Sequence, residues 1–143
     1  MPRRPLPRPT PLTEPWWAAA AQGRLVIQHC ERCATYLHPP EPICPRCHDS
    51  DLVFREVSGR GRIYAFTTMT QPRVEGFEDA LPLSCVAVEL EEQPGLCVLT
   101  NLVGDPGAPG DPAEPVVGAE VEVTFEPIGD GVVLPQFRLT AGA

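Results

Sequence analysis

The sequence of 143 residues contains no lysine, and aromatic residues make up 6% of it. Its net charge of −8 is divided unevenly. Residues 1–62 hold nine arginines and six acidic residues, a net +3, whereas residues 63–143 hold two arginines and thirteen acidic residues, a net −11. A groove for nucleic acid needs a positive face that displaces counterions from phosphates. The charge distribution therefore argues against a nucleic-acid partner.

Long apolar runs are also missing. No stretch approaches the ~20 apolar residues that a transmembrane helix needs, so we expect no membrane partner. The first ten residues hold three arginines and four prolines, and no apolar stretch follows them, which is unlike a signal peptide. Cys85 and Cys97 lie among aliphatic residues, where free buried thiols are expected. We therefore expect a reducing, cytoplasmic location.

Four of the six cysteines are regularly spaced. Cys30 and Cys33 form one Cys-x₂-Cys pair, and Cys44 and Cys47 form a second after ten intervening residues. A tight turn brings both thiolates of a pair to one side of the backbone, and two facing turns supply four sulfurs to Zn²⁺ at ~2.3 Å. Because four sulfurs complete a tetrahedral shell, we predict one structural zinc per chain with no open position for chemistry.

Other uses of these cysteines are less well supported. A redox Cys-x₂-Cys pair usually opens a helix and needs no second pair. A disulfide framework suits a secreted chain, and iron–sulfur clusters use other spacings. His29, His38 and His48 lie close to the pairs. With four thiolates available, we interpret these histidines as solvated or packing residues.

The remaining pattern predicts a mainly β chain in three parts. We assign residues 1–29 to an N-terminal arm, a short helix and a lead-in strand, residues 30–57 to a rubredoxin-like zinc ribbon, and residues 58–143 to an OB-fold barrel. Residues 58–61 are predicted to be a flexible turn, and prolines mark residues 104–115 as a surface loop. Five strand-like segments without helices favour a five-stranded barrel. These segments are residues 63–70, 83–90, 96–103, 120–126 and 132–139.

A short helix between Thr13 and Gly23 carries two adjacent tryptophans, Trp16 and Trp17. Thr13 is predicted as its N-cap and Gly23 as its end. About nine residues are too few for a helix to persist alone, so it must dock on a surface. Adjacent side chains project roughly 100° apart. Either both tryptophans pack on the chain's own ribbon, or one faces inward and the other anchors a partner protein.

No convincing catalytic constellation is present in the sequence. Glu120, Glu122 and Glu126 lie on one face of a predicted strand, which is typical of a solvated face rather than of paired catalytic carboxylates. Gly59-Arg60-Gly61 precedes a strand rather than a helix, so it is a turn and not a phosphate cradle. These residues favour a non-catalytic binding or scaffolding protein.

Taken in order, these features resemble the zinc-ribbon/OB-fold family of acyl-CoA-associated proteins, long known as a domain of unknown function. One departure is the residue after each cysteine pair, where glycine with positive φ is common and where Ala34 and His48 stand. The matching motifs are Pro15-Trp16-Trp17, Gly23-Arg24-Leu25, the two cysteine pairs, His38-Pro39-Pro40, Ser58-Gly59-Arg60-Gly61, Thr67-Thr68, Pro82-Leu83, Val88-Glu89-Leu90, Gly118-x-x-Val121-Glu122-Val123 and Phe137.

The resemblance implies a partner enzyme and no catalytic residue in this chain. Members of the family accompany thiolase-like enzymes, including lipid-transfer-protein-type aldolases that shorten steroid side chains, and others accompany enoyl-CoA hydratases of the hot-dog fold. The chain would then be a non-catalytic, zinc-stabilised subunit of a hetero-oligomer that processes acyl-CoA. The four cysteines would be its zinc ligands.

The residues themselves suggest contacts that fit this picture. The helix with Trp16 and Trp17, together with the arginine-rich arm, is the candidate for one interface with the partner. Alternatively, the arginines of the arm are candidates for binding the phosphates of coenzyme A. A stand-alone OB-fold binder of single-stranded nucleic acid is the alternative from another class. It would need stacking aromatic residues on a basic face, whereas residues 63–143 carry −11.

Overall fold

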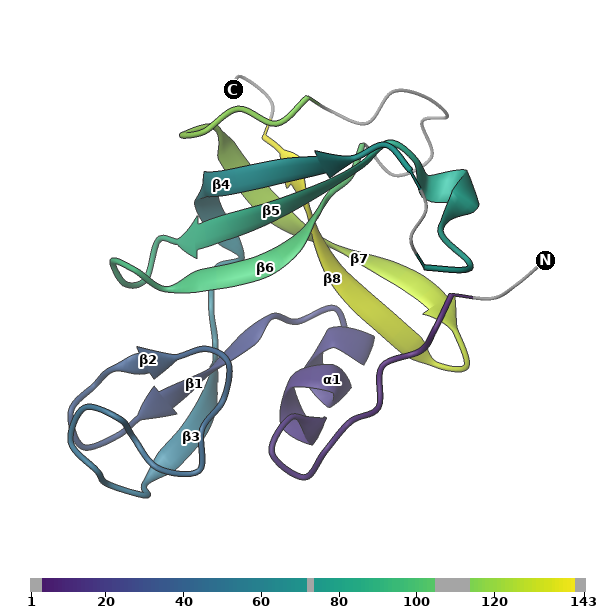
Figure 1. Ribbon diagram of the computed structural model, residues 1–143. Coiled ribbons are helices and arrows are strands. Elements are labelled where there is room, and N and C mark those ends of the chain that lie inside the picture. The colour runs from purple at the N-terminus through teal and green to yellow at the C-terminus, as the bar shows by residue number, and fades with distance from the viewer. Residues whose placement is uncertain (1–3, 72–73, 105–113, 141–143) are drawn as a thin grey trace.

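The computed structural model describes residues 4–71, 74–104 and 114–140. A short helix and a small sheet precede a closed five-stranded barrel (Figure 1). The predicted mainly β fold is therefore confirmed. Most of the predicted loop over residues 104–115 lies outside the described residues, as do the first three residues of the arm. Within the described ranges, no helix is long and apolar enough to cross a membrane.

The first sheet has three antiparallel strands and leads the chain to the first cysteine pair. β1 (Val26–Cys30) lies in the middle, between β2 (Tyr36–Leu37) and β3 (Leu52–Glu56). Cys30, the last residue of β1, pairs with Leu52 at the start of β3. Because the end of β1 pairs with the start of β3, the second cysteine pair, which precedes β3 in the chain, lies close to the first pair.

The barrel strands follow one another in the order β4-β5-β6-β8-β7. Neighbours are antiparallel except β6 and β8, which are parallel, and β4 closes on β7 through residues 60–62. Every second side chain of β5 is buried, as expected for a half-buried strand. The elements are β4 (Arg60–Met69), the 3₁₀ turn η1 (Glu78–Ala80), β5 (Leu83–Leu90), β6 (Cys97–Leu102), β7 (Glu120–Gly129) and β8 (Val132–Leu139).

One apolar core joins the small sheet to the barrel. Leu25, Ile27 and Val57 flank or belong to the small sheet, and they pack into the same cluster as the fully buried Phe137 of β8. A unit as small as the first sheet cannot bury a sufficient core alone, so the shared core fixes it against the barrel. The other buried members are Ile63, Val86, Val88, Leu90, Leu96, Val98, Leu102 and Val121.

β4 begins earlier than the sequence indicates. Gly59 does bend the chain, with a φ of +76°, but Arg60 and Gly61 already pair with β7. The prediction of a flexible turn over residues 58–61 is therefore wrong in its second half. A Cβ at Gly61 would lie 2.3 Å from the carbonyl oxygen of Glu89. Glycine is needed here because β4 and β5 approach closely, not because the segment bends.

The helix α1 (Glu14–Ala21) lies against the barrel beside the small sheet (Figure 1). It packs mainly on β8 and to a smaller extent on β1. Ala19 and Ala20 are its buried residues, and their small side chains allow the helix to approach closely. The helix thus docks more on the barrel than on the ribbon. This differs from the first alternative for Trp16 and Trp17, in which both pack on the ribbon.

Candidate metal centre

Each cysteine pair lies on a tight turn closed by a backbone hydrogen bond. The N–H of Ala34 donates to the carbonyl oxygen of Cys30, and the N–H of His48 donates to that of Cys44, both at 2.8 Å. Ala34 and His48 have positive φ values of 56° and 63°. The left-handed conformation expected at both positions is therefore confirmed, although neither residue is a glycine.

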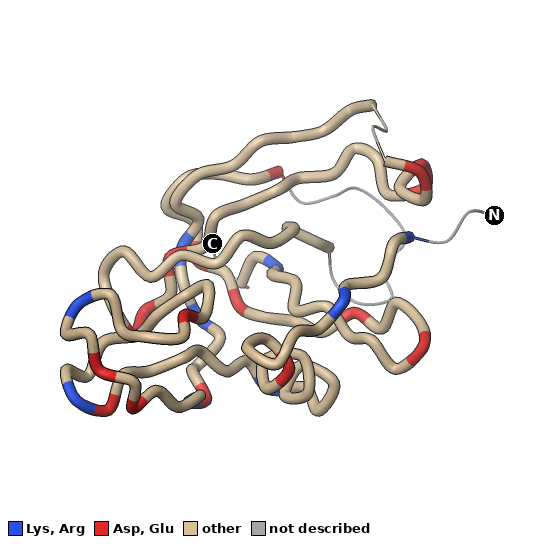
Figure 2. The backbone as a smooth tube through the Cα atoms, turned by 60° about the horizontal axis from the view of Figure 1, so that its bottom comes forward, with Lys and Arg blue, Asp and Glu red and all other residues tan. Residues whose placement is uncertain are grey.

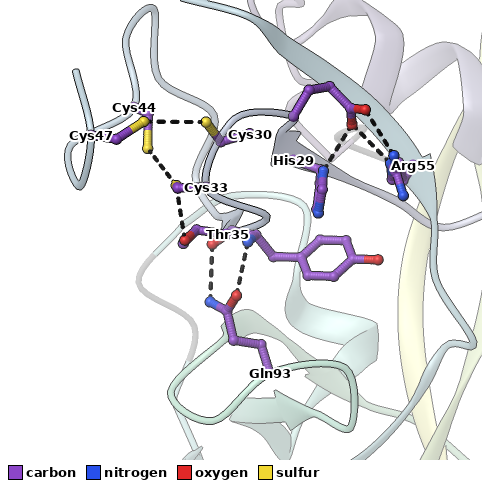
Figure 3. A network of polar contacts seen from close by, with 10 residues as sticks. His29, Cys30, Cys33, Thr35, Cys44, Cys47, Arg55 and Gln93 are labelled. Atoms are coloured by element: carbon purple, nitrogen blue, oxygen red, sulfur yellow. Dashed lines mark hydrogen bonds and ion pairs between the residues drawn. The ribbon is translucent and has the colours of Figure 1, made fainter. Parts of the chain in front are cut away.

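The two turns face each other and bring the four predicted cysteines together (Figure 3). The Sγ atoms of Cys30 and Cys47 lie 3.6 Å apart, as do those of Cys33 and Cys44, and all four lie within 4.8 Å of one another. Sulfurs at ~2.3 Å from a tetrahedral Zn²⁺ stand about 3.8 Å apart, whereas a disulfide bond measures about 2.05 Å. The four sulfurs are free thiols placed to bind a metal ion.

The sulfurs differ in exposure and in acidity. Cys30 and Cys44 are buried, whereas Cys33 and Cys47 are partly exposed. The hydrogen bond between Cys33 and the Thr35 hydroxyl lowers the pKa of the Cys33 thiol to about 6. A backbone hydrogen bond at Asp49 lowers the pKa of Cys47, but burial and the neighbouring sulfurs raise it to about 12. Four thiolates this close need a cation between them to be ionised together.

Charged side chains connect the two turns outside the sulfurs. Arg32, in the first turn, contacts Asp49, which follows the second, with 3.2 Å between Nη1 and Oδ2. The Asp49 carboxylate also accepts a hydrogen bond of 2.8 Å from the N–H of Asp51. The bond from Asp51 and the contact with Arg32 both lower the pKa of the Asp49 carboxyl. Of these two contacts, the Arg32–Asp49 ion pair joins the two turns.

The three histidines lie around the cysteine cluster but do not join it. His29 is buried, and its Nδ1 lies 2.9 Å from Oε1 of Glu31. His38 is partly buried, with its ring 6.3 Å from that of Trp16, and burial lowers the pKa of His38. His48 is exposed. In the part of the chain that the structure describes, the metal-binding group consists of the four cysteines alone.

The turn between β5 and β6 fixes the ribbon to the barrel. The side-chain amide of Gln93 donates to the Tyr36 carbonyl oxygen at 3.1 Å and accepts from the Tyr36 N–H at 2.8 Å (Figure 3). Gln93 therefore pairs with the edge of β2 as a neighbouring strand would. Beside it, Glu92 accepts a hydrogen bond of 2.6 Å from the N–H of Ser58. We refer to residues 91–93 as the hairpin clamp.

Sequence reasoning missed the hairpin clamp. Glu91 forms its ion pair with Arg60, 31 residues earlier, and Gln93 reaches Tyr36, 57 residues earlier. The local pattern of residues 91–95 indicates a turn and nothing more. A contact between side chains so distant along the chain has no signal in a single sequence.

Trp16 and Trp17 are both partly buried but have different surroundings. Their rings meet edge to face, with centroids 4.6 Å apart. Trp16 packs against the shared core, and its Nε1 is buried without a hydrogen-bond partner among the described residues. Trp17 lines a hollow of about 260 Å³ between α1, the arm and the start of β8. Trp16 therefore faces inward, and the partner role of Trp17 stays a prediction.

The arm follows the barrel before it reaches α1 (Figure 1). Arg4 forms an ion pair of 3.2 Å with Glu126, and its guanidinium group lies 5.3 Å from the centre of the Phe77 ring. Arg8 is exposed. The two described arginines of the arm thus differ, because Arg4 contacts the barrel whereas Arg8 is exposed.

The three carboxylates of β7 are paired with arginines rather than with one another. This arrangement agrees with the interpretation of a charged outer face and not of a catalytic carboxylate pair. The ion pairs join Glu120 to Arg62 at 2.7 Å, Glu122 to Arg138 at 2.9 Å and Glu126 to Arg4 at 3.2 Å.

Two family models match adjoining stretches of the chain. Residues 17–53, which include the cysteine cluster, match the model described as ChsH2, rubredoxin-like zinc ribbon domain. Residues 54–126, which include most of the barrel, match the model described as ChsH2, C-terminal OB-fold domain.

Curated proteins with similar sequences include one enzyme subunit and one scaffold. The chain is 37% identical over 123 residues to the probable enoyl-CoA hydratase alpha subunit of Thermomonospora curvata, a match that covers 86% of this chain but only 36% of that relative. It is 30% identical over 136 residues to a DUF35 domain-containing scaffold protein of Pyrococcus furiosus, with 92% of this chain and 93% of that relative covered.

Solved structures show the same architecture. A chain of the Ltp2-ChsH2(DUF35) aldolase superposes with a TM-score of 0.80 at 34% identity, covering 94% of this chain and 98% of that one. A DUF35-family protein of unknown function from Sulfolobus solfataricus superposes with a TM-score of 0.59 at 15% identity, covering 91% and 86%. The second likeness shows the fold alone.

Proposed function

We propose that this chain, which belongs to the ChsH2 (DUF35) family of zinc-ribbon and OB-fold proteins, is a non-catalytic subunit of an enzyme complex that acts on acyl-CoA thioesters. The observation that carries the proposal is the likeness, over almost the whole chain, to a chain of the Ltp2-ChsH2(DUF35) aldolase. The partner we propose is a thiolase-like aldolase that shortens steroid or other acyl side chains. The two form a hetero-oligomer in the cytoplasm.

The metal ion in this proposal is one structural Zn²⁺ per chain. Its ligands are the four cysteines, whose sulfur spacing fits a tetrahedral ion of this size. A shell of four sulfurs leaves no position for water or substrate, so the zinc supplies folding free energy rather than chemistry.

In the proposed complex, the partner subunit supplies the catalytic residues. Several of the described groups that could transfer protons are engaged in structural contacts. His29 binds Glu31 beside the metal centre, and Glu120 and Glu122 on β7 are paired with arginines. This chain would support the fold of its partner and help to shape the entrance for acyl-CoA.

A tagged pull-down from the native cytoplasm, with the bound proteins identified by mass spectrometry, tests the proposal. We expect a thiolase-like chain in an equimolar amount, and the recovered complex should catalyse retro-aldol cleavage of a β-hydroxyacyl-CoA. Recovery of this chain alone, or with nucleic acid, would contradict the proposal.

The second candidate is a subunit of an enoyl-CoA hydratase of the hot-dog fold. The observation that favours it is the 37% identity to the probable enoyl-CoA hydratase alpha subunit. The chain spans about a third of that relative. A hot-dog-fold protein in the same pull-down, with hydration of an enoyl-CoA by the recovered complex, would replace the aldolase by the hydratase.

A further inference from the structure

The outer face of β4, β5 and β6 carries no charge over three successive rows of cross-strand neighbours. Side chains at alternate positions of β5 point outward, because the residues between them are buried, and their partners on β4 and β6 share this face. We call this set the outer patch. Its rows are Ala65, Ala87 and Leu99, then Thr67, Cys85 and Asn101, then Met69 and Leu83.

The residues of the outer patch are exposed or partly exposed, and most of them are apolar. Leu99 is 84% exposed and Met69 is 37% exposed. Between them, the three strands enclose an open hollow of about 530 Å³. Figure 2, in which basic residues are blue and acidic residues are red, shows long stretches of tan backbone without charged residues. A contiguous apolar surface with a charged surrounding is typical of a protein–protein interaction site.

Among the described residues, the same face ends in a strand edge that no second strand covers. β4 pairs with β7 only through residues 60–62, and Ile63 still bonds to residues 118 and 119. From Tyr64 to Met69, β5 is the one strand paired with β4 in the described parts of the chain. All six residues are exposed, and none is charged or a proline. Soluble proteins usually protect such an edge with charge or proline, so this edge needs a cover.

We infer that the outer patch and the edge of β4 form the docking surface for the catalytic subunit, an inference that rests on the proposed function. The partner surface should be uncharged and apolar, because the patch offers no charge to pair. An extended strand of the partner can add to the edge of β4 through main-chain hydrogen bonds, while apolar side chains enter the hollow beside Leu99.

The net negative charge of the chain favours the catalytic subunit as the partner at this surface over a second copy of the chain or a nucleic acid. Two copies of the chain, each with a net charge of −8, repel each other when they associate. OB-folds bind single strands on the corresponding strands in other proteins. Here residues 63–143 carry two arginines against thirteen acidic residues, and the outer patch holds neither arginine.

The test measures binding of the purified thiolase-like chain of the same organism by calorimetry, with the metal-loaded full chain and two variants. Leu99→Glu places a charge in the patch, and Val53→Glu places the same charge on β3, where Val53 is 38% exposed. Because an unpaired charge in an interface is costly, we expect Leu99→Glu to weaken binding at least about 30-fold. Val53→Glu should bind like the wild type. Thr67→Arg, in the neighbouring row, repeats the test if Leu99→Glu does not fold.

Three outcomes would overturn the inference, and they differ in what else they affect. Equal binding by the wild type and both patch variants would show that the docking surface is wrong, while the proposed function would stand. Failure of the wild type to bind the thiolase-like chain would remove the proposed function together with this surface. If light scattering showed that the isolated wild type is a dimer and Leu99→Glu a monomer, the occupant would be a second copy.

Discussion

Ala34 and His48 adopt the same left-handed backbone conformation, but the steric strain differs between the two residue types. Both follow a cysteine pair and have positive φ. Histidine is enriched several-fold in the left-handed region, whereas alanine pays a steric cost of roughly 1–2 kcal/mol there. The sequence predicts both the conformation and the unequal strain, because the Cys-x₂-Cys turn is a local feature that depends on few residues.

Ala34→Gly should therefore stabilise the metal-loaded protein. We expect a gain of about 0.5–1 kcal/mol in the free energy of unfolding, because glycine removes the strain but increases the entropy of the unfolded chain. His48→Gly should gain less. Denaturant unfolding of the two variants measures this difference, and a loss of stability in Ala34→Gly would refute the strain argument.

Thr13 shows where residue-level prediction fails. It stands directly before α1 as predicted, but its hydroxyl does not cap the helix. Instead the hydroxyl oxygen accepts a hydrogen bond of 2.9 Å from the N–H of Thr10, while the Thr13 carbonyl accepts the N–H groups of Trp16 and Trp17. Composition indicates a helix start correctly, but the choice between two nearby hydrogen-bond partners depends on how the arm is folded.

Replacement of Trp16 should lower the stability of the protein more than replacement of Trp17. Trp16 packs on the shared core, so Trp16→Ala should cost about 3 kcal/mol of stability through the cavity it leaves. Trp17 lines the surface hollow beside the arm, so Trp17→Ala should cost less than about 1.5 kcal/mol. Thermal unfolding of both variants distinguishes the two roles. Equal losses would contradict the inward and outward assignment.

If Trp17 also anchors the partner, its loss should weaken the assembly without releasing the metal. Co-purification of the tagged Trp17→Ala variant with the thiolase-like chain, together with its zinc content, measures this effect. Undiminished co-purification would remove α1 from the interface. Trp17→Phe is the matched control, because it keeps an aromatic side chain on the helix surface.

At the scale of elements, the sequence indicates strands well but their partners poorly. The segment Glu120–Glu126 alternates apolar and acidic residues and is found in β7, because alternation reports directly on a half-buried strand. The parallel pairing of β6 with β8, and the closing of β4 on β7, have no comparable signal. Pairing depends on the whole set of strands that compete for each edge. For the same reason, the sequence pattern places the start of β4 too late.

The hairpin clamp is the element whose removal should loosen the ribbon. Gln93→Ala leaves the N–H and the carbonyl of Tyr36 without their partner, which should cost about 1–3 kcal/mol of stability. Gln93→Glu is the control, because it keeps the acceptor but loses the donor and should recover only part of the loss. Hydrogen exchange at Tyr36 should rise in Gln93→Ala, and unchanged protection would show that the clamp does not hold β2.

At the scale of the whole molecule, metal and barrel should be linked through the shared core. Leu25 and Ile27 enter that core from the ribbon side, so a ribbon that loses its metal also withdraws apolar contacts from the barrel. A chelator should therefore lower the thermal stability of the entire chain. The check is calorimetry with and without chelator, and an unchanged transition of the barrel would show that the two parts are independent.

In the function proposed for this chain, the partner carries out catalysis and this chain has a structural role. The most direct test is an assay of retro-aldol cleavage of a β-hydroxyacyl-CoA by this chain alone and by its equimolar mixture with the purified thiolase-like chain. We predict no cleavage by this chain alone and cleavage by the mixture. Cleavage by this chain alone, or a mixture that neither associates nor reacts, would contradict the claim that it is a non-catalytic subunit.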